Sequence, residues 1–81
     1  MNYRFVIEQA AFRTLLSCAP RERRFLHEVF GRLADAPFHE PDLREVIQGR
    51  ELHTRFFGPF SVTYWLDHAV REVRIVLIFR D

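Results

Sequence analysis

One short stretch of the sequence places an imidazole between two guanidinium groups. Arg50, His53 and Arg55 follow one another closely, and a strand would set His53 and Arg55 side by side because alternate residues share a face. Guanidinium forks bind phosphate and stabilise pentavalent charge, while imidazole moves protons near neutral pH. This combination is typical of a site that binds or cleaves a phosphodiester.

A third basic residue, Arg80, ends the last apolar run of the sequence and would join the pair if that strand lay beside theirs. We therefore predict His53, Arg55 and Arg80 as catalytic residues. The alternative is that they are solvated strand residues that keep the chain soluble, because charged side chains are mostly exposed.

Trp65 is the single tryptophan and has two interpretations. It could stack against a base, or it could cap the sheet and anchor a partner protein. With Arg50 and Arg74 it forms the predicted substrate-binding set.

Several classes of site are excluded by what the sequence lacks. Only three glycines are present, and none forms a phosphate-binding loop. The lone Cys18 cannot form an internal disulfide. The four histidines lack the short paired spacing of metal ligands; they are His27, His39, His53 and His68. We expect no metal and no cofactor.

The composition fits one small folded domain over residues 1–81. Nine phenylalanines and a hydrophobic share of 48% supply a core for a chain of 81 residues. The net charge is +1, and all twelve basic residues are arginine. No apolar run is long enough for a membrane span or a secretory signal, so a cytoplasmic protein is expected.

Hydrophobic periodicity predicts the elements that would position these residues. Residues 3–7 alternate as a strand, residues 8–19 have helical spacing, and Pro20 is well placed to begin a second helix that ends before Pro37. The later segments alternate as strands: residues 50–57, 60–66 and 73–79, with a turn at Gly58-Pro59 and a weaker, ambiguous strand over residues 43–48.

This order predicts an α+β fold in which a strand and a two-helix hairpin precede a three- to four-stranded antiparallel sheet. Both helices would lie on one face of the sheet. The uncovered face would then carry His53 and Arg55 together with Ser61, Thr63 and Trp65, and the last strand could add Arg74 and Arg80.

The chain resembles the RelE/ParE superfamily of toxins over nearly its whole length. The resemblance lies in the segment Leu33-Ala34-Asp35-Ala36-Pro37 and above all in the run GPFSVTYWLDHAVREVRIVLI, which begins at Gly58. It implies the toxin of a type II toxin-antitoxin system, neutralised by a cognate antitoxin protein. RelE-like members cleave messenger RNA on the ribosome without a metal, whereas ParE-like members inhibit DNA gyrase.

The resemblance also implies where the basic residues of a RelE-like site would fall. Arg55 and His53 occupy the strand in which relatives keep basic residues, and Arg80 corresponds to the arginine that closes the last strand. Two departures weaken the nuclease interpretation: Ser61 stands where many relatives have arginine, and the sequence ends at Asp81, before the segment that often carries a catalytic tyrosine or histidine. A non-catalytic, protein-binding toxin fold is therefore the alternative.

Overall fold

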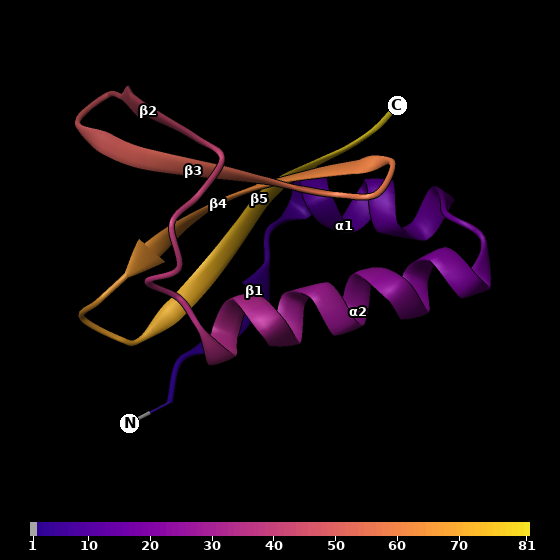
Figure 1. Cartoon of the computed structure of the whole chain (residues 1–81), viewed down its shortest axis with the longest axis horizontal. Helices are drawn as coiled ribbons and strands as arrows, with labels where there is room; N and C mark the ends of the chain where they lie inside the picture. Colours follow the sequence, from indigo (N-terminus) through magenta and orange to yellow (C-terminus); the bar gives the residue numbers. More distant parts are fainter. Residues whose placement is uncertain (1) are drawn as a thin grey trace.

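The structure, a computed structural model, describes residues 2–81, so Met1 lies outside the described part. A two-helix hairpin packs on one face of a five-stranded sheet (Figure 1). The elements follow in chain order: β1 (Arg4–Ile7), α1 (Gln9–Ser17), α2 (Pro20–Asp35), β2 (Leu43–Ile47), β3 (Arg50–Phe57), β4 (Phe60–Asp67) and β5 (Glu72–Arg80).

The strands lie in the order β1-β5-β4-β3-β2, and all neighbours are antiparallel except β1 and β5. The predicted α+β class is confirmed, and the ambiguous segment is strand β2. The sheet has five strands because four follow the helices and β1 joins them in parallel beside β5.

Local sequence explains where the helices begin and the hairpins turn. Pro20 is the first residue of α2, and Glu22 accepts a hydrogen bond from the Ala19 backbone N–H at 2.8 Å. Gln48 and Gly49 both have positive φ, as a type I′ turn between β2 and β3 requires. Gly58 has a φ of 59° and is followed by proline, which fits a type II′ turn between β3 and β4.

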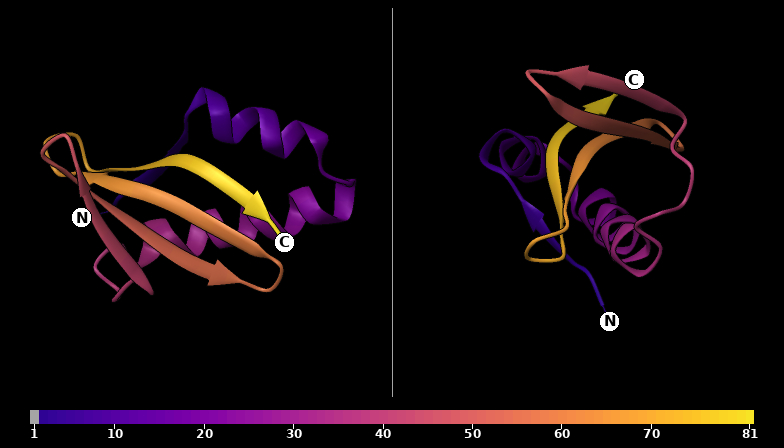
Figure 2. Two further views of the ribbon diagram at one scale, coloured as in Figure 1. Left: turned by 90° about the horizontal axis from the view of Figure 1, so that it is seen from above. Right: turned by 90° about the vertical axis from the view of Figure 1, so that its left-hand side faces the viewer.

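The core lies between the helices and one face of the sheet. Leu26, Val29 and Phe30 of α2 are fully buried and belong to the same cluster as Tyr64 and Ile75 of the sheet. The helices contact β1 and β5, whereas β3 and β2 extend beyond them (Figure 2). The outer part of the helix-bearing face is therefore left open.

The register of the β3–β4 hairpin decides which residues share a face. Phe57 is opposite the buried Phe60, and His53 is opposite the buried Tyr64, so His53 lies on the helix-bearing face. Arg55, opposite Val62, lies on that face too. The expectation that His53 and Arg55 share the uncovered face with Ser61, Thr63 and Trp65 is wrong.

An ion-pair network fixes β1 against β5. Glu72 is 7% exposed and accepts hydrogen bonds from Arg4 at 2.8 Å and from Arg74 at 2.7 Å. Arg74 also donates to Glu8 at 2.8 Å. The hydrogen bond from Arg4, followed by that from Arg74, holds the pKa of Glu72 below its usual value of 4.5 against the opposing effect of burial.

This network predicts a specific acid sensitivity. Because the pKa of Glu72 is lower in the folded state than in the unfolded state, its stabilising contribution is complete above pH 4.5 and is lost as the pH falls through the folded-state value. Thermal unfolding between pH 7 and pH 3 should therefore show a shallower acid loss for Glu72→Gln than for the parent chain. Glu45→Gln on the exposed strand β2 is the matched control and should keep the parent's pH dependence. Identical acid losses in all three proteins would contradict this role for Glu72.

Candidate functional site

A depression of about 460 Å³ opens where β3 begins and β4 ends, beside the segment that follows α2. Arginine, histidine and tryptophan side chains dominate its lining. Among the lining residues are Arg44, Arg50, Glu51, His53 and Trp65, with His39 and His68 at the rim. We call this depression the basic pocket.

His53 is the most enclosed ionisable side chain of the basic pocket. It is 9% exposed, its Nε2 lies 2.5 Å from an Oε of Glu51, and its ring meets Tyr64 edge to face at 5.4 Å. The hydrogen bond between His53 and Glu51 fixes the imidazole and lowers the pKa of Glu51 from its usual value. The Nδ1 of His53 is buried and has no hydrogen-bond partner among residues 2–81. Such an unpaired buried atom costs free energy and requires an explanation.

The predicted substrate-binding residues do come together. The Arg50 guanidinium lies 3.8 Å from the centre of the Trp65 ring, and that of Arg74 lies 5.8 Å from it. Arg74 is committed to Glu8 and Glu72, whereas Arg50 is free of any ion pair within residues 2–81. Arg50 is therefore the member of this set best able to turn toward an anion.

The three predicted catalytic residues do not converge. Arg55 follows His53 on the same face of β3, with its guanidinium 4.9 Å from the Phe57 ring. Arg80 lies opposite Phe60 at the far end of β4, and it forms a 2.7 Å ion pair with Glu22 of α2. The expectation that Arg80 lies beside His53 is wrong, because the hairpin register places Arg80 at the opposite end of the strands.

Arg44 and Glu51 are among the pocket residues that were missed from the sequence. The β2–β3 register places Arg44 directly opposite His53, and Glu51 precedes His53 on the same face of β3. The Gln48-Gly49 turn was the available signal, since a two-residue type I′ turn fixes the pairing of the two strands. Arg44 also donates a hydrogen bond of 2.9 Å to the exposed carboxylate of Glu40.

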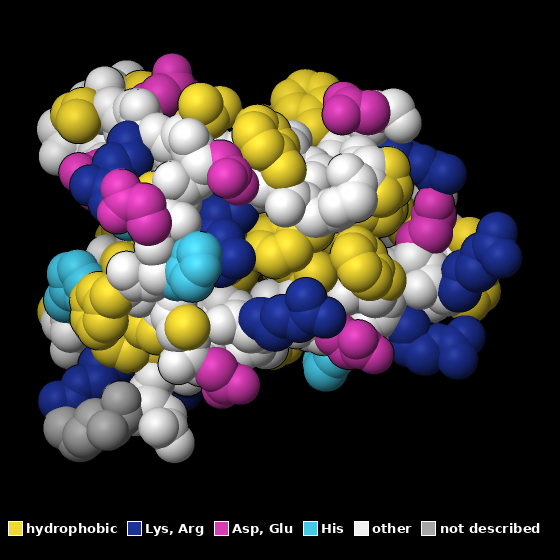
Figure 3. All heavy atoms as spheres, viewed as in Figure 1, with side chains coloured by type: hydrophobic (Ala, Val, Ile, Leu, Met, Phe, Trp, Pro, Cys, Tyr) yellow, Lys and Arg dark blue, Asp and Glu magenta, His cyan; other side chains and the backbone are white. Residues whose placement is uncertain are grey.

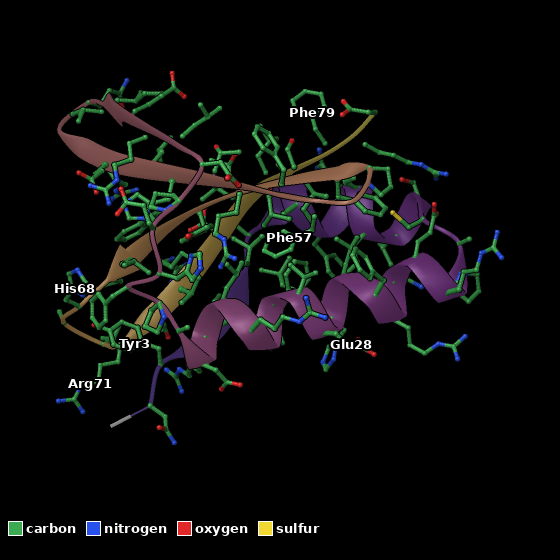
Figure 4. All side chains as sticks on the ribbon, in the orientation of Figure 1. Tyr3, Glu28, Phe57, His68, Arg71 and Phe79 are labelled. Carbon is green, nitrogen blue, oxygen red and sulfur yellow. The ribbon has the colours of Figure 1, made fainter. Side chains whose placement is uncertain are left out.

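A cluster of three rings, from Tyr3, Phe38 and His68, supports one wall of the basic pocket. The Tyr3 hydroxyl lies 2.6 Å from Nδ1 of His68, and Phe38 stacks on the His68 ring at 5.8 Å. Figure 4 shows Tyr3 and His68 side by side, with Arg71 directed away from them. The contacts tie together the residue before β1, the segment after α2 and the turn after β4, so this wall does not depend on a single element.

Within residues 2–81, no three His, Cys, Asp or Glu side chains are arranged to hold a metal ion. In the same part of the chain, neither helix has the length and apolar character needed to cross a membrane.

Comparison with solved structures defines the class of fold. The chain superposes with a TM-score of 0.82 on a chain of the toxin-antitoxin complex RelBE2 from Mycobacterium tuberculosis, with 21% identity and full coverage of both chains. It superposes with a TM-score of 0.74 on a chain of the archaeal RelE-RelB complex from Pyrococcus horikoshii OT3, with 20% identity over 99% of this chain and 96% of the other. No protein-family model and no curated protein matches the sequence.

The fold is thus one that occurs in toxin-antitoxin complexes. Specifically, this chain has the RelE toxin fold over its entire described length. The predicted resemblance is confirmed at the level of the fold.

Proposed function

We propose that this chain is the toxin component of a toxin-antitoxin pair and that a cognate antitoxin protein neutralises it in the cytoplasm. The observation that carries the proposal is the match to a chain of the RelBE2 complex, which covers 100% of both chains with a TM-score of 0.82. Fold alone does not fix activity, so the activity has to be argued from the site.

For the activity, we propose cleavage of messenger RNA on the ribosome. The basic pocket supports it because Arg44 and Arg50 offer guanidinium forks to a phosphate, while Trp65 offers an aromatic surface beside them. Arg55, on the same face of β3 as His53, would add a further phosphate contact. Arg80 falls outside this set because of its distance along the sheet and its ion pair with Glu22.

His53 would move the proton in this proposal. In the observed arrangement its Nε2 is held by Glu51 and its Nδ1 is buried, so neither nitrogen is open to a substrate. Rotation of the exposed Glu51 side chain would release Nε2 into the pocket. Substrate binding would therefore have to precede proton transfer.

A second candidate is a toxin that acts by binding a protein, such as DNA gyrase, without catalysis. It is favoured by the uncovered sheet face, which presents large exposed apolar side chains and no catalytic base or acid in its centre. Phe56 and Phe79 flank Ser61 on this face, and Leu77 lies opposite Thr63. Loss of DNA supercoiling with an intact message would select this candidate.

Controlled expression in a bacterial host tests the toxin proposal. We expect growth to stop when the chain is induced, and to resume when the short reading frame adjoining its gene is co-expressed. Growth that continues despite soluble, folded chain at readily detectable levels would contradict the proposal. Arrest that the adjoining product does not relieve would contradict the antitoxin part of it.

A further inference from the structure

A second hollow lies at the opposite end of the molecule from the basic pocket. It measures about 390 Å³ and sits between the start of α2 and the β3–β4 turn. Its lining is mainly apolar, with charge only at the rim: Arg21, Glu22, Phe25, Gly58, Pro59 and Phe60. We call it the hairpin hollow.

Basic side chains lie at the rim of the hairpin hollow and beside it on α2. Arg21 and Arg24 lie three residues apart on α2, so both project from the same side of the helix, and both are exposed. Arg80 reaches the rim from β5. Figure 3 shows dark-blue side chains gathered at the end of the molecule where the two helices meet.

The carboxylate at this rim is already engaged. One oxygen of Glu22 accepts the Ala19 backbone N–H at 2.8 Å, and the other pairs with Arg80 at 2.7 Å. Arg21 and Arg24 have no ion pair within residues 2–81, so their charge is uncompensated. Asp81 donates its backbone N–H to the Pro59 carbonyl and adds negative charge on the β5 side. The positive field is therefore strongest on the α2 side.

Arg21 and Arg24 do not stabilise α2 by their position near its start. Cations near a helix N-terminus oppose the macrodipole, which favours acidic residues there. Glu22 is the acidic residue of the first turn of α2, whereas Arg21, Arg23 and Arg24 surround it. Arg23 satisfies the carbonyl of Cys18 at 2.7 Å, but Arg21 and Arg24 face solvent. A role in binding would account for them.

We infer that the hairpin hollow binds an acidic peptide segment of a partner protein, with one apolar side chain seated in the hollow and carboxylates paired with Arg21 and Arg24. This inference rests on the proposed function, in which the partner is the antitoxin. Charge complementarity fixes the acidic character of the segment, and the apolar lining fixes the need for an anchor side chain.

Nucleic acid fits the hairpin hollow less well. Phe60 is 3% exposed and Phe25 packs against it with ring centres 6.1 Å apart, so no open pair of aromatic faces is available for base stacking. A sugar-phosphate backbone would use the arginines but leave the apolar lining uncovered. A peptide uses both.

The inference is tested by titrating three synthetic peptides into the ¹⁵N-labelled chain at low salt. The probes are Glu-Asp-Leu-Glu-Asp-Leu-Glu, its charge-reversed form with lysines, and an acidic form in which serine replaces leucine. We expect the first peptide alone to shift the amide signals of Arg21, Phe25 and Gly58 in a saturable manner. The double variant Arg21→Glu/Arg24→Glu should weaken its binding about tenfold.

The variants are chosen so that folding does not obscure the result. Glutamate near the start of α2 agrees with the helix dipole, so the double variant should fold at least as stably as the parent. Arg32→Glu near the end of the same helix is the control and should bind like the parent. Equal binding of all peptides, no binding, or tighter Arg21- and Arg24-dependent binding of a single-stranded RNA oligonucleotide would overturn the inference. These outcomes concern binding by the isolated chain. The inference about the hairpin hollow can therefore fail while growth arrest and its relief still support the toxin proposal.

Discussion

Replacing Phe30 by alanine is expected to lower the free energy of unfolding by about 3–5 kcal/mol, as large-to-small changes of buried aromatic residues do. Phe30 is 0% exposed in the centre of α2 and lies 5.5 Å, ring to ring, from Phe5 of β1. It therefore joins the helical layer to the edge strand. A chain of 81 residues has a total stability of only about 4–12 kcal/mol, so this one change removes a large share of it.

Urea unfolding followed by circular dichroism measures this loss. Phe79→Ala is the matched control, because the same side chain on β5 is 63% exposed and its removal should shift the midpoint little. Comparable losses for Phe30→Ala and Phe79→Ala would show that the core is not where the structure places it.

If the chain cleaves messages on the ribosome as proposed, replacing Arg50 by alanine is expected to reduce the cleavage rate by about 10²-fold, the usual effect of removing one preorganised charge donor. Arg50 lines the basic pocket, stacks 3.8 Å above Trp65 and has no ion pair within residues 2–81. Its charge is therefore available to a scissile phosphate. Arg50→Lys keeps the charge but loses the planar fork, so an intermediate rate is expected.

Arg32→Ala controls for the loss of one positive charge and should retain the parent rate, because Arg32 lies near the end of α2, outside the basic pocket. Circular dichroism of each variant separates a folding defect from a loss of activity. Parent-like cleavage by a folded Arg50→Ala protein would remove Arg50 from the proposed site.

The architecture could be predicted from the sequence because its signals are local. Alternation in residues 60–66, Pro20 at the start of α2 and the glycine of the β3–β4 turn each depend on a few neighbouring residues. The parallel pairing of β1 with β5 joins the two ends of the chain, and periodicity carries no signal for such a contact.

The site was predicted less well because its geometry depends on register. A strand's alternation shows that His53 and Arg55 share a face, but not which one. The two-residue turn at Gly58-Pro59 pairs Phe57 with the core residue Phe60. Because alternate residues share a face, this pairing also places His53 and Arg55 on the helix-bearing face. The ion pair of Arg80 with Glu22 joins residues far apart in the sequence and could not be read from spacing.

The most direct test of the account is to map the 5′ ends of a defined message in a reconstituted translation reaction containing the purified chain. We expect new ends that require both the chain and translating ribosomes, without added metal beyond what translation itself needs. A message that stays intact in the presence of excess folded chain would contradict RNA cleavage as its activity.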